Sequence, residues 1–122
     1  YVANQVIKLM IKKGHKIEGS KVLVLGITFK ENCPDIRNSR VIDVINELKE
    51  FGCDLTVTDY WADKEEVKDE YNLELNNDVN YDDYEAIVLA VAHDEYKNLE
   101  FKNKNQIIYD IKSILKNSDS RL

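Results

Sequence analysis

Cysteine is scarce in this sequence and follows no recognisable pattern. Of the 122 residues only Cys33 and Cys53 are cysteines, and they form neither a CxxC pair nor another spacing typical of metal ligands. We therefore expect no disulfide and no zinc site, and we expect a reducing, cytoplasmic setting.

Long apolar segments are also missing. No run approaches the length of a membrane span or resembles the centre of a signal peptide. Because the chain starts at Tyr1 rather than at a methionine, we expect a soluble piece of a longer protein. Its length suits one domain with a substantial core, but it is too short for separate cofactor and substrate domains.

Positive charge is in deficit. The chain has 17 lysines and arginines against 23 acidic residues, a net charge of −6, which argues against nucleic acid as a partner. The acids gather between residues 63 and 85, whereas the segment with Lys30, Arg37 and Arg40 is locally basic. An anionic ligand is expected there.

Residues 21–52 are the segment around which the chain is organised, because they predict a strand, a loop and a helix. The unbroken apolar run Val22–Leu25 is typical of a strand covered on both faces, and Gly26 ends it. The apolar residues from 41 to 51 recur at helical spacing. Ser39 or Asn38 is expected to cap the start of this helix, and Gly52 to form a left-handed C-cap.

Shorter patterns predict the remaining elements. The expected strands are residues 55–58, 73–75, 86–92 and 106–111, and the expected helices or helical turns are residues 1–15, 62–71, 81–85, 95–99 and a terminal turn after Ser113. Strands that alternate with helices predict a Rossmann-like α/β fold, a three-layer αβα sandwich with a mostly parallel five-stranded sheet preceded by an N-terminal helix. A strand order of 3-2-1-4-5 would place ligands at the carboxyl ends of the first and fourth strands.

The loop between the first strand and its helix is rich in functional groups but is not a dinucleotide fingerprint. A GxGxxG motif starting at Gly26 would need glycine at Thr28 and at Glu31. A helix start still favours an anion such as phosphate, so Lys30 and Arg37 would supply the charge themselves. Alternatively, each is a solvated loop cation.

The segment LGITFKENCPDIRNSRVIDVI, residues 25–45, closely resembles the C-terminal domain of the UDP-glucose/GDP-mannose dehydrogenase family. The similarity extends from about Tyr1 to Leu115 and points to the branch that oxidises UDP-N-acetylhexosamines for bacterial polysaccharides. It implies an NAD-dependent dehydrogenase and a homodimer in the full-length protein. It also implies that residues 1–18 end a central linking and dimerisation helix, and that residues 19–122 form the domain that binds the UDP-sugar.

The resemblance also assigns roles to individual residues. Phe29 and Lys30 would meet the nucleotide sugar, and Arg37 would reach the NAD held mainly by another domain. Lys112, in the sequence DIK, stands where the family has an arginine in a DGR-like motif, so it keeps the charge but loses the planar fork. The family's catalytic cysteine belongs to a middle region that this sequence lacks, and Cys33 lies in a different motif. The chain alone should therefore be inactive.

Three features remain open to a structural or a functional interpretation. Asp59, after the second predicted strand, either holds a ribose or caps the following turn, and His93 is more often a structural hydrogen-bonding residue than a catalyst. The apolar arc of residues 1–15 includes Val2, Val6, Leu9 and Met10. It is wider than one small domain needs and predicts self-association through this helix, unless the helix simply docks on its own domain.

A free-standing nucleotide-binding or receiver-like signalling module is the alternative function. A receiver shares this size and a lysine near the last strand, but it holds Mg²⁺ with clustered acids after the first strand. The sequence ITFK at that position offers no acid.

Overall fold

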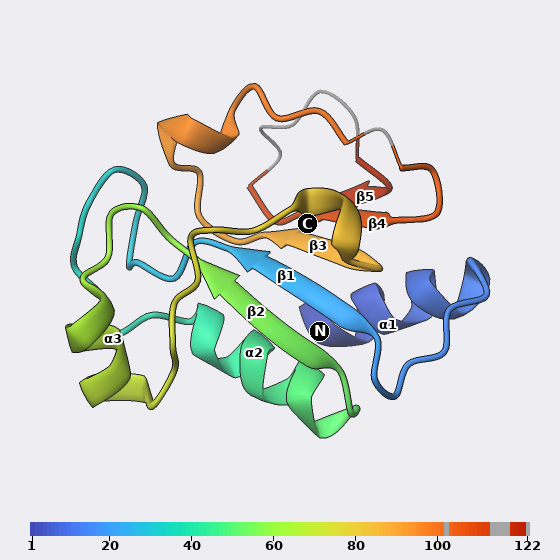
Figure 1. Ribbon diagram of the computed structural model, residues 1–122, viewed down its shortest axis with the longest axis horizontal. Coiled ribbons are helices and arrows are strands. Elements are labelled where there is room, and N and C mark those ends of the chain that lie inside the picture. Colours follow the sequence, from blue (N-terminus) through green and yellow to red (C-terminus); the bar gives the residue numbers. More distant parts are fainter. Residues whose placement is uncertain (102, 113–117, 122) are drawn as a thin grey trace.

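The computed structural model describes residues 1–101, 103–112 and 118–121, and these fold around a parallel five-stranded sheet (Figure 1). The elements in chain order are α1 (Val2–Lys12), β1 (Lys21–Leu25), α2 (Val41–Glu50), β2 (Asp54–Thr58), α3 (Lys64–Tyr71), η1 (Tyr81–Asp83), β3 (Ala86–Leu89), η2 (Asp94–Tyr96), β4 (Ile107–Asp110) and β5 (Ser120–Arg121), where η marks a 3₁₀-helix. The helical turn expected after Ser113 falls on residues 113–117, outside the described residues.

The sheet has the order β2-β1-β3-β4-β5, with β1 paired in parallel to both β2 and β3. The strand expected at residues 73–75 is reduced to a single bridge between Leu75 and Val57 of β2. The predicted spatial order is therefore confirmed, and β5 is an additional short strand that the sequence did not predict. The switch between the two winding directions lies between β1 and β3, as expected.

The two faces of the sheet are covered differently. Alternate side chains of β1, β3 and β4, including Val24 and Tyr109, pack with α1 and α2 in the larger core. The other alternate side chains, including Leu23 and Ile87, pack with Tyr96 of η2 and with partly buried residues near η1. Figure 1 shows α1 and α2 on one side of the sheet and the segments containing η1 and η2 on the other. The predicted Rossmann-like fold class is confirmed, although in the described part of the chain the second covering layer consists of 3₁₀ turns and loops.

Helix α1 docks on its own domain. Val6 and Met10 are fully buried within the chain, so these two residues are not available for the predicted self-association through this helix, which itself stays a prediction. Val2 and Leu9 are partly buried against the same core. Helix α1 packs against α2 and also against β3 and β4 of the sheet. These two sets of contacts explain why its apolar arc is wide. What it leaves exposed is Tyr1 and Ile11.

Helix α2 starts without the predicted side-chain cap. Arg40 occupies the N-cap position, and neither Asn38 nor Ser39 caps the first turn. The physical reason is register: Asn38 adopts a left-handed conformation two residues before the cap, and the buried hydroxyl of Ser39 has no partner among the described residues. At the other end Gly52 has φ +92°, and the amides of Gly52 and Cys53 donate to Lys49 and Leu48 as in a Schellman motif, so the predicted glycine cap is confirmed.

Gly26 ends β1 for a steric reason. Its φ is +96°, and a Cβ atom there would lie 2.6 Å from Cβ of Val91, which follows β3. The chain after β1 and the chain after β3 therefore run in close contact.

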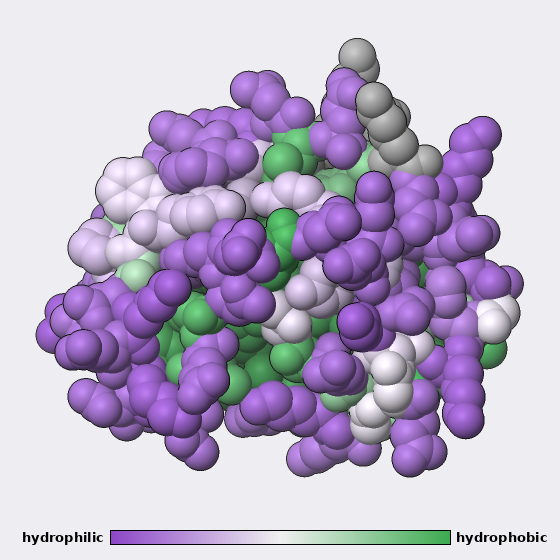
Figure 2. All heavy atoms as spheres, in the orientation of Figure 1, coloured by the Kyte–Doolittle hydropathy of each residue, from purple (hydrophilic) through white to green (hydrophobic). Residues whose placement is uncertain are grey.

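The surface seen in Figure 2 is largely hydrophilic, with apolar side chains visible between polar ones. No helix in the described ranges is long and apolar enough to cross a bilayer. Cys33 and Cys53 are both free thiols, and Cys53 is buried.

Candidate functional site

A cavity of about 410 Å³ opens beside the carboxyl ends of β1 and β3. Five segments supply its walls: the start of α1, the loop after β1, the start of α2, the chain after β3 and the chain after β4. The lining residues are Val2, Thr28, Phe29, Asn38, Arg40, Val41, Val44, Ala90, Val91, Ile111 and Lys112. The cavity thus lies at the topological switch point, where ligands of open α/β sheets bind.

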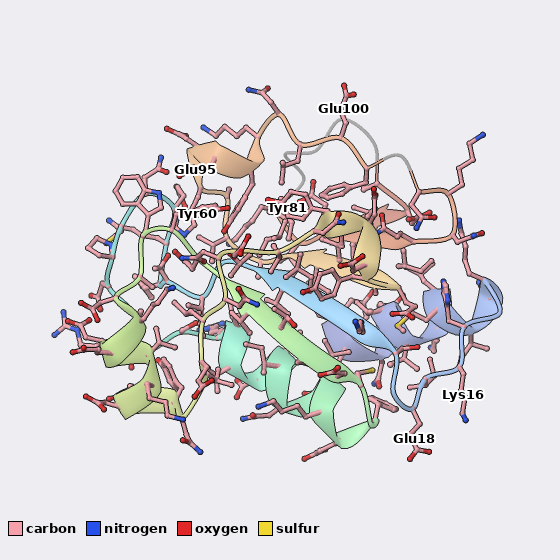
Figure 3. All side chains as sticks on the ribbon, in the orientation of Figure 1. Lys16, Glu18, Tyr60, Tyr81, Glu95 and Glu100 are labelled. Carbon is pink, nitrogen blue, oxygen red and sulfur yellow. The ribbon has the colours of Figure 1, made fainter. Side chains whose placement is uncertain are left out.

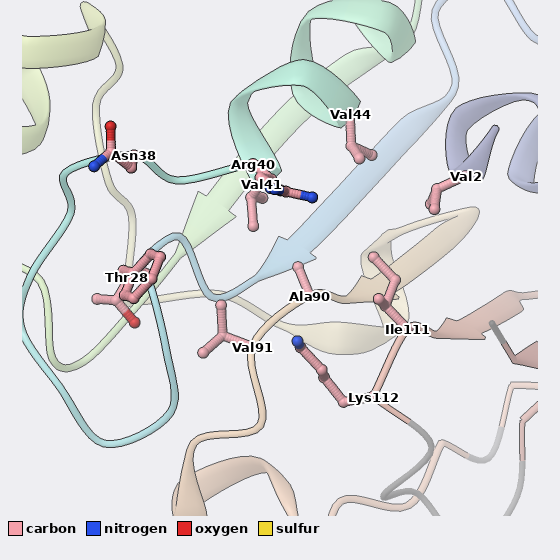
Figure 4. Close-up of a pocket in the computed structure, with 11 residues that line it drawn as sticks. Val2, Thr28, Asn38, Arg40, Val41, Val44, Ala90, Val91, Ile111 and Lys112 are labelled. Carbon is pink, nitrogen blue, oxygen red and sulfur yellow. The ribbon is translucent and has the colours of Figure 1, made fainter.

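Two cations and a helix start make this cavity suitable for an anion. Arg40 comes from the N-cap of α2, and Lys112 follows β4. Figure 4 shows their charged ends directed toward the space between α2 and the end of β3. No side chain caps α2, and the helix dipole favours negative charge at this point.

Apart from Thr28 and Asn38, the remaining lining residues are apolar. Val41, Val44 and Ile111 contribute aliphatic surface, and the ring of Phe29 is 59% exposed. A cavity with apolar walls and a few convergent polar groups is typical of small-molecule sites. This one can hold a molecule that is anionic at one end and apolar or flat at the other.

The structure brings together only part of the predicted set of site residues. Phe29 and Lys112 line the same cavity, whereas Lys30 is exposed on the adjoining loop and does not line it. Arg37 lies apart, beside a separate hollow of about 370 Å³ whose other lining residues include Glu66, Asp69 and Glu70 of α3.

Asp35 holds Arg37 in a two-pronged contact. Nε and Nη2 of Arg37 each donate to one oxygen of Asp35 at 3.0 Å, and the backbone N–H of Arg37 donates to the same carboxylate. The side-chain hydrogen bond from Arg37, helped by its backbone N–H, lowers the pKa of Asp35 to about 2. The Arg37 side chain is nevertheless 80% exposed, so an incoming group can reach it.

Asp59 is a buried acceptor at the end of β2. Its Oδ2 accepts the N–H groups of Ile27 and Thr28 at 2.7 and 3.2 Å and lies 3.0 Å from Nε2 of His93. Its Oδ1 accepts the N–H groups of Trp61 and Ala62. Burial raises the pKa of Asp59, but the hydrogen bonds from His93, Ile27 and Trp61 outweigh it, so the net pKa is lowered.

These contacts decide between the two interpretations of Asp59. Both oxygens are occupied and the residue is fully buried, so it caps the following turn and leaves no oxygen for a ribose. His93 is likewise fully buried and hydrogen-bonded within the fold, as expected of a structural hydrogen-bonding residue.

The described residues do not form a dinucleotide site. The turn after β1 places Thr28, with its buried side chain, where a glycine fingerprint would admit a pyrophosphate, and Asp59 cannot take the ribose.

Sequence reasoning missed several residues at this edge. Arg40 was noted only for its charge, and Asn32 was not singled out, because neither belongs to a periodic pattern. Trp61 was also missed: its Nε1–H donates to both carboxylate oxygens of Glu95. Figure 3 shows Glu95 and Tyr60 at this end of the sheet and Lys16 and Glu18 at the opposite end.

Comparisons with known proteins agree with the geometry. The family model described as "UDP-glucose/GDP-mannose dehydrogenase family, UDP binding domain" matches residues 23–117. UDP-N-acetyl-D-glucosamine 6-dehydrogenase of Salmonella typhi is 46% identical over 130 residues, covering 100% of this chain and 31% of that protein. Protein CapL of Staphylococcus aureus is 42% identical over 128 residues, covering 98% of this chain and 29% of that protein.

A solved structure shares the fold. The NDP-N-acetyl-D-galactosaminuronic acid dehydrogenase from Methanosarcina mazei Go1 superposes with a TM-score of 0.80 at 22% identity, over 94% of this chain and 25% of that one. The chain thus spans about 30% of the length of the curated relatives that it matches.

Proposed function

The chain belongs to the UDP-glucose/GDP-mannose dehydrogenase family, and we propose that it is the UDP-sugar-binding domain of an NAD-dependent UDP-sugar 6-dehydrogenase. Its substrate would be a UDP-N-acetylhexosamine, oxidised to the uronate for polysaccharide synthesis, since relatives named for such sugars are up to 46% identical. Residues 1–18 would end the linking helix of a homodimer and residues 19–122 would form the binding domain. A cytoplasmic location belongs to this proposal, because both cysteines are free thiols.

The observation that carries the proposal is the cavity between α2 and the end of β3. A UDP-sugar has an anionic pyrophosphate between two less charged parts, and this cavity has Arg40, Lys112 and a helix start beside apolar walls. The pyrophosphate would lie between the two cations. Phe29 would contact the flat or sugar part of the ligand, and Lys30 would reach the sugar end from the loop.

Arg37 has a different task in this proposal. Its exposed guanidinium, aligned by Asp35, would extend to the NAD held by another domain of the parent enzyme. NAD supplies the hydride acceptor when bound there. The residues described here bind and orient the nucleotide sugar and hold no reacting atom, so the chain alone should not reduce NAD with any UDP-sugar, as absorbance at 340 nm will test.

Calorimetric titration of the 122-residue chain tests the proposal directly. UDP should bind, and uridine, which lacks the phosphates, should bind at least tenfold more weakly. Lys112→Ala and Arg40→Ala should each lose on the order of ten- to a hundredfold in UDP affinity, since one charged hydrogen bond is worth roughly 1.5 to 3 kcal/mol.

Lys16→Ala is the matched control, because Lys16 is exposed at the opposite end of the sheet (Figure 3). It should leave UDP affinity unchanged. Equal affinity for UDP and uridine, or an equal loss in the control variant, would contradict the proposed site.

A further inference from the structure

A cluster of buried polar side chains lies beside the cavity. Of its members only Thr28 lines the cavity. Thr28 follows β1, Asp59 follows β2 and His93 follows β3, and all three are at most 1% exposed. Buried polar groups are costly unless they are hydrogen-bonded. The hydrogen bonds of these three side chains therefore show which segments of the chain the cluster holds in place.

The hydrogen bonds fix which nitrogen of His93 carries the proton. The backbone N–H of Asn32 donates to Nδ1 at 2.9 Å, so Nδ1 is an acceptor without a proton. Nε2 lies 3.0 Å from Oδ2 of Asp59 and 3.1 Å from Oγ1 of Thr28. The Thr28 hydroxyl itself donates to the carbonyl of Lys30, so Nε2 is the donor and the imidazole is neutral.

The same hydrogen bonds hold the first half of the loop after β1, residues 28–32, which we call the inner loop. Asn32 adopts a left-handed conformation with φ 54°, and besides its N–H bond to His93 its side-chain oxygen accepts the N–H of Asp94. Thr28 holds the carbonyl of Lys30. Phe29 and Lys30 are thus presented by a backbone segment that is fixed at both ends, although their own side chains are exposed.

The environment of His93 keeps water away from this anchor. Trp61 stacks on the imidazole with ring centroids 6.0 Å apart, and Tyr96 of η2 lies at 5.8 Å. The charged or titratable groups around the ring are Asp59 from the end of β2, Asp94 and Tyr96 from η2, and Glu95 through its bond to Trp61. A low-dielectric setting makes the loss of any one of these hydrogen bonds costly.

We propose that His93 is a positioning residue for the nucleotide-sugar site: through the acceptor Nδ1 it fixes the inner loop, and with it the placement of Phe29 and Lys30. This inference rests on the proposed function, in which those two residues meet the UDP-sugar. An apolar side chain of equal size would fill the space but leave the Asn32 N–H without its acceptor.

Two carboxamide variants distinguish the roles of the two imidazole nitrogens, because each variant keeps the hydrogen bond of one nitrogen and loses that of the other. In His93→Asn the side-chain oxygen can occupy the place of Nδ1 and accept from Asn32, whereas in His93→Gln the amide reaches the place of Nε2 and donates to Asp59. Both lose one hydrogen bond and both should unfold at lower urea concentration, as the fluorescence of the single tryptophan reports.

Positioning predicts that the two variants differ in UDP-sugar affinity. His93→Gln should bind about tenfold more weakly than the unaltered chain, and His93→Asn within about threefold of it. The Asn32 amide should exchange its hydrogen faster in His93→Gln than in His93→Asn. A purely structural role predicts instead that affinity follows stability in both variants, and that result would overturn the proposal.

A measurement on the unaltered chain tests the proposal even if neither variant folds. The ¹⁵N chemical shifts of the His93 ring should show an unprotonated, hydrogen-bonded Nδ1 and a protonated Nε2, and a protonated Nδ1 would overturn the proposal. If the unaltered chain failed to bind UDP or a UDP-sugar, the proposed function would fail. The anchoring of the inner loop would still be tested by these shifts and by Asn32 amide exchange.

Discussion

Two carboxylates at the same edge of the sheet, Asp59 and Asp35, each lie 3.0 Å from a basic side chain, but in opposite surroundings. The Asp59–His93 pair is fully buried, whereas in the Asp35–Arg37 pair the side chains are 34% and 80% exposed. Asp59 accepts hydrogen bonds from the chain after β1 and from the turn after β2, while Asp35 binds only within its own loop among the contacts described. Equal distance therefore does not mean equal importance for the fold.

The loop after β1 has two parts, and each part contains residues held by one of these two pairs. The inner loop is tied through His93 and Asp59 to the ends of two other strands. Residues 33–37 extend beyond it, attached through the Phe29 N–H to the Asp35 carbonyl and through Tyr71, whose hydroxyl donates to Ile36. The side chain of Ile36 is also buried in the larger core, so residues 33–37 are anchored at Ile36 while Arg37 stays exposed.

The largest expected effect is that of Asp59→Asn on stability. Whichever way the amide is turned, its NH₂ group would face backbone N–H donors that now meet a carboxylate oxygen. Each buried N–H group that loses its acceptor costs about 1 to 3 kcal/mol, and two of them lose it in either orientation of the amide, so the free energy of unfolding should fall by about 3 kcal/mol or more. Urea denaturation followed by tryptophan fluorescence measures it, and a loss as small as that of Asp35→Asn would erase the distinction between the pairs.

The next effect separates Lys30, on the inner loop, from Arg37, beyond it. Lys30→Ala should lose on the order of ten- to a hundredfold in UDP-sugar affinity, since a charged hydrogen bond is worth roughly 1.5 to 3 kcal/mol. Arg37→Lys should leave the affinity of this chain for UDP nearly unchanged and should raise KM for NAD or lower kcat in the full-length enzyme. Calorimetry on the chain and steady-state kinetics on the whole enzyme distinguish them. Loss of UDP binding in Arg37→Lys, with normal NAD kinetics, would reverse the assignment.

Acid should reduce the contribution of the Asp59 carboxylate to the free energy of unfolding. Folding lowers the pKa of Asp59, so its carboxylate stabilises the folded state above the ordinary pKa of 3.8, and this contribution disappears as the pH falls through the lower folded value. The difference in unfolding free energy between the unaltered chain and Asp59→Asn should therefore be constant from pH 5 to 7 and should narrow below about pH 4. A difference that stays constant down to pH 2 would contradict this account.

The smallest effect belongs to the exposed pair. Asp35 has a pKa of about 2, so it remains charged across the range where most carboxylates titrate. Solvent nevertheless screens the pair. Asp35→Asn should have a urea midpoint indistinguishable from that of the unaltered chain at pH 7, in low and in high salt alike. A clear shift would show that residues 33–37 are held more firmly than these contacts indicate.

The sequence predicted the sheet well because its strands are local apolar runs. Residues 22–25 and 86–89 are continuous apolar segments, and such runs identify strands that are buried on both faces. The Gly52 cap was also predictable, because a glycine directly after a helix commonly adopts the left-handed conformation of a C-cap. The start of α2 was not, because a left-handed Asn38 shifts the chain out of register with its expected cap.

The candidate site was predictable only in part, for a physical reason. Phe29 and Lys112 were chosen from sequence similarity, and they line one cavity. The anchor made by Asp59, His93 and Asn32 joins residues that are far apart in the sequence, and no periodicity encodes such contacts. Whether a histidine supports a loop or performs chemistry is decided by its neighbours in space.

The two free cysteines differ in a way that is useful for experiments. Cys53 is buried, and burial raises the pKa of its thiol, so little reactive thiolate is present at neutral pH. Cys33 is half-exposed and follows Asn32 directly, at the junction between the anchored and the extended parts of the loop. A maleimide fluorophore should therefore attach to Cys33 without any change to the sequence, and its emission anisotropy would report in real time whether the motion of this junction changes when a nucleotide sugar binds.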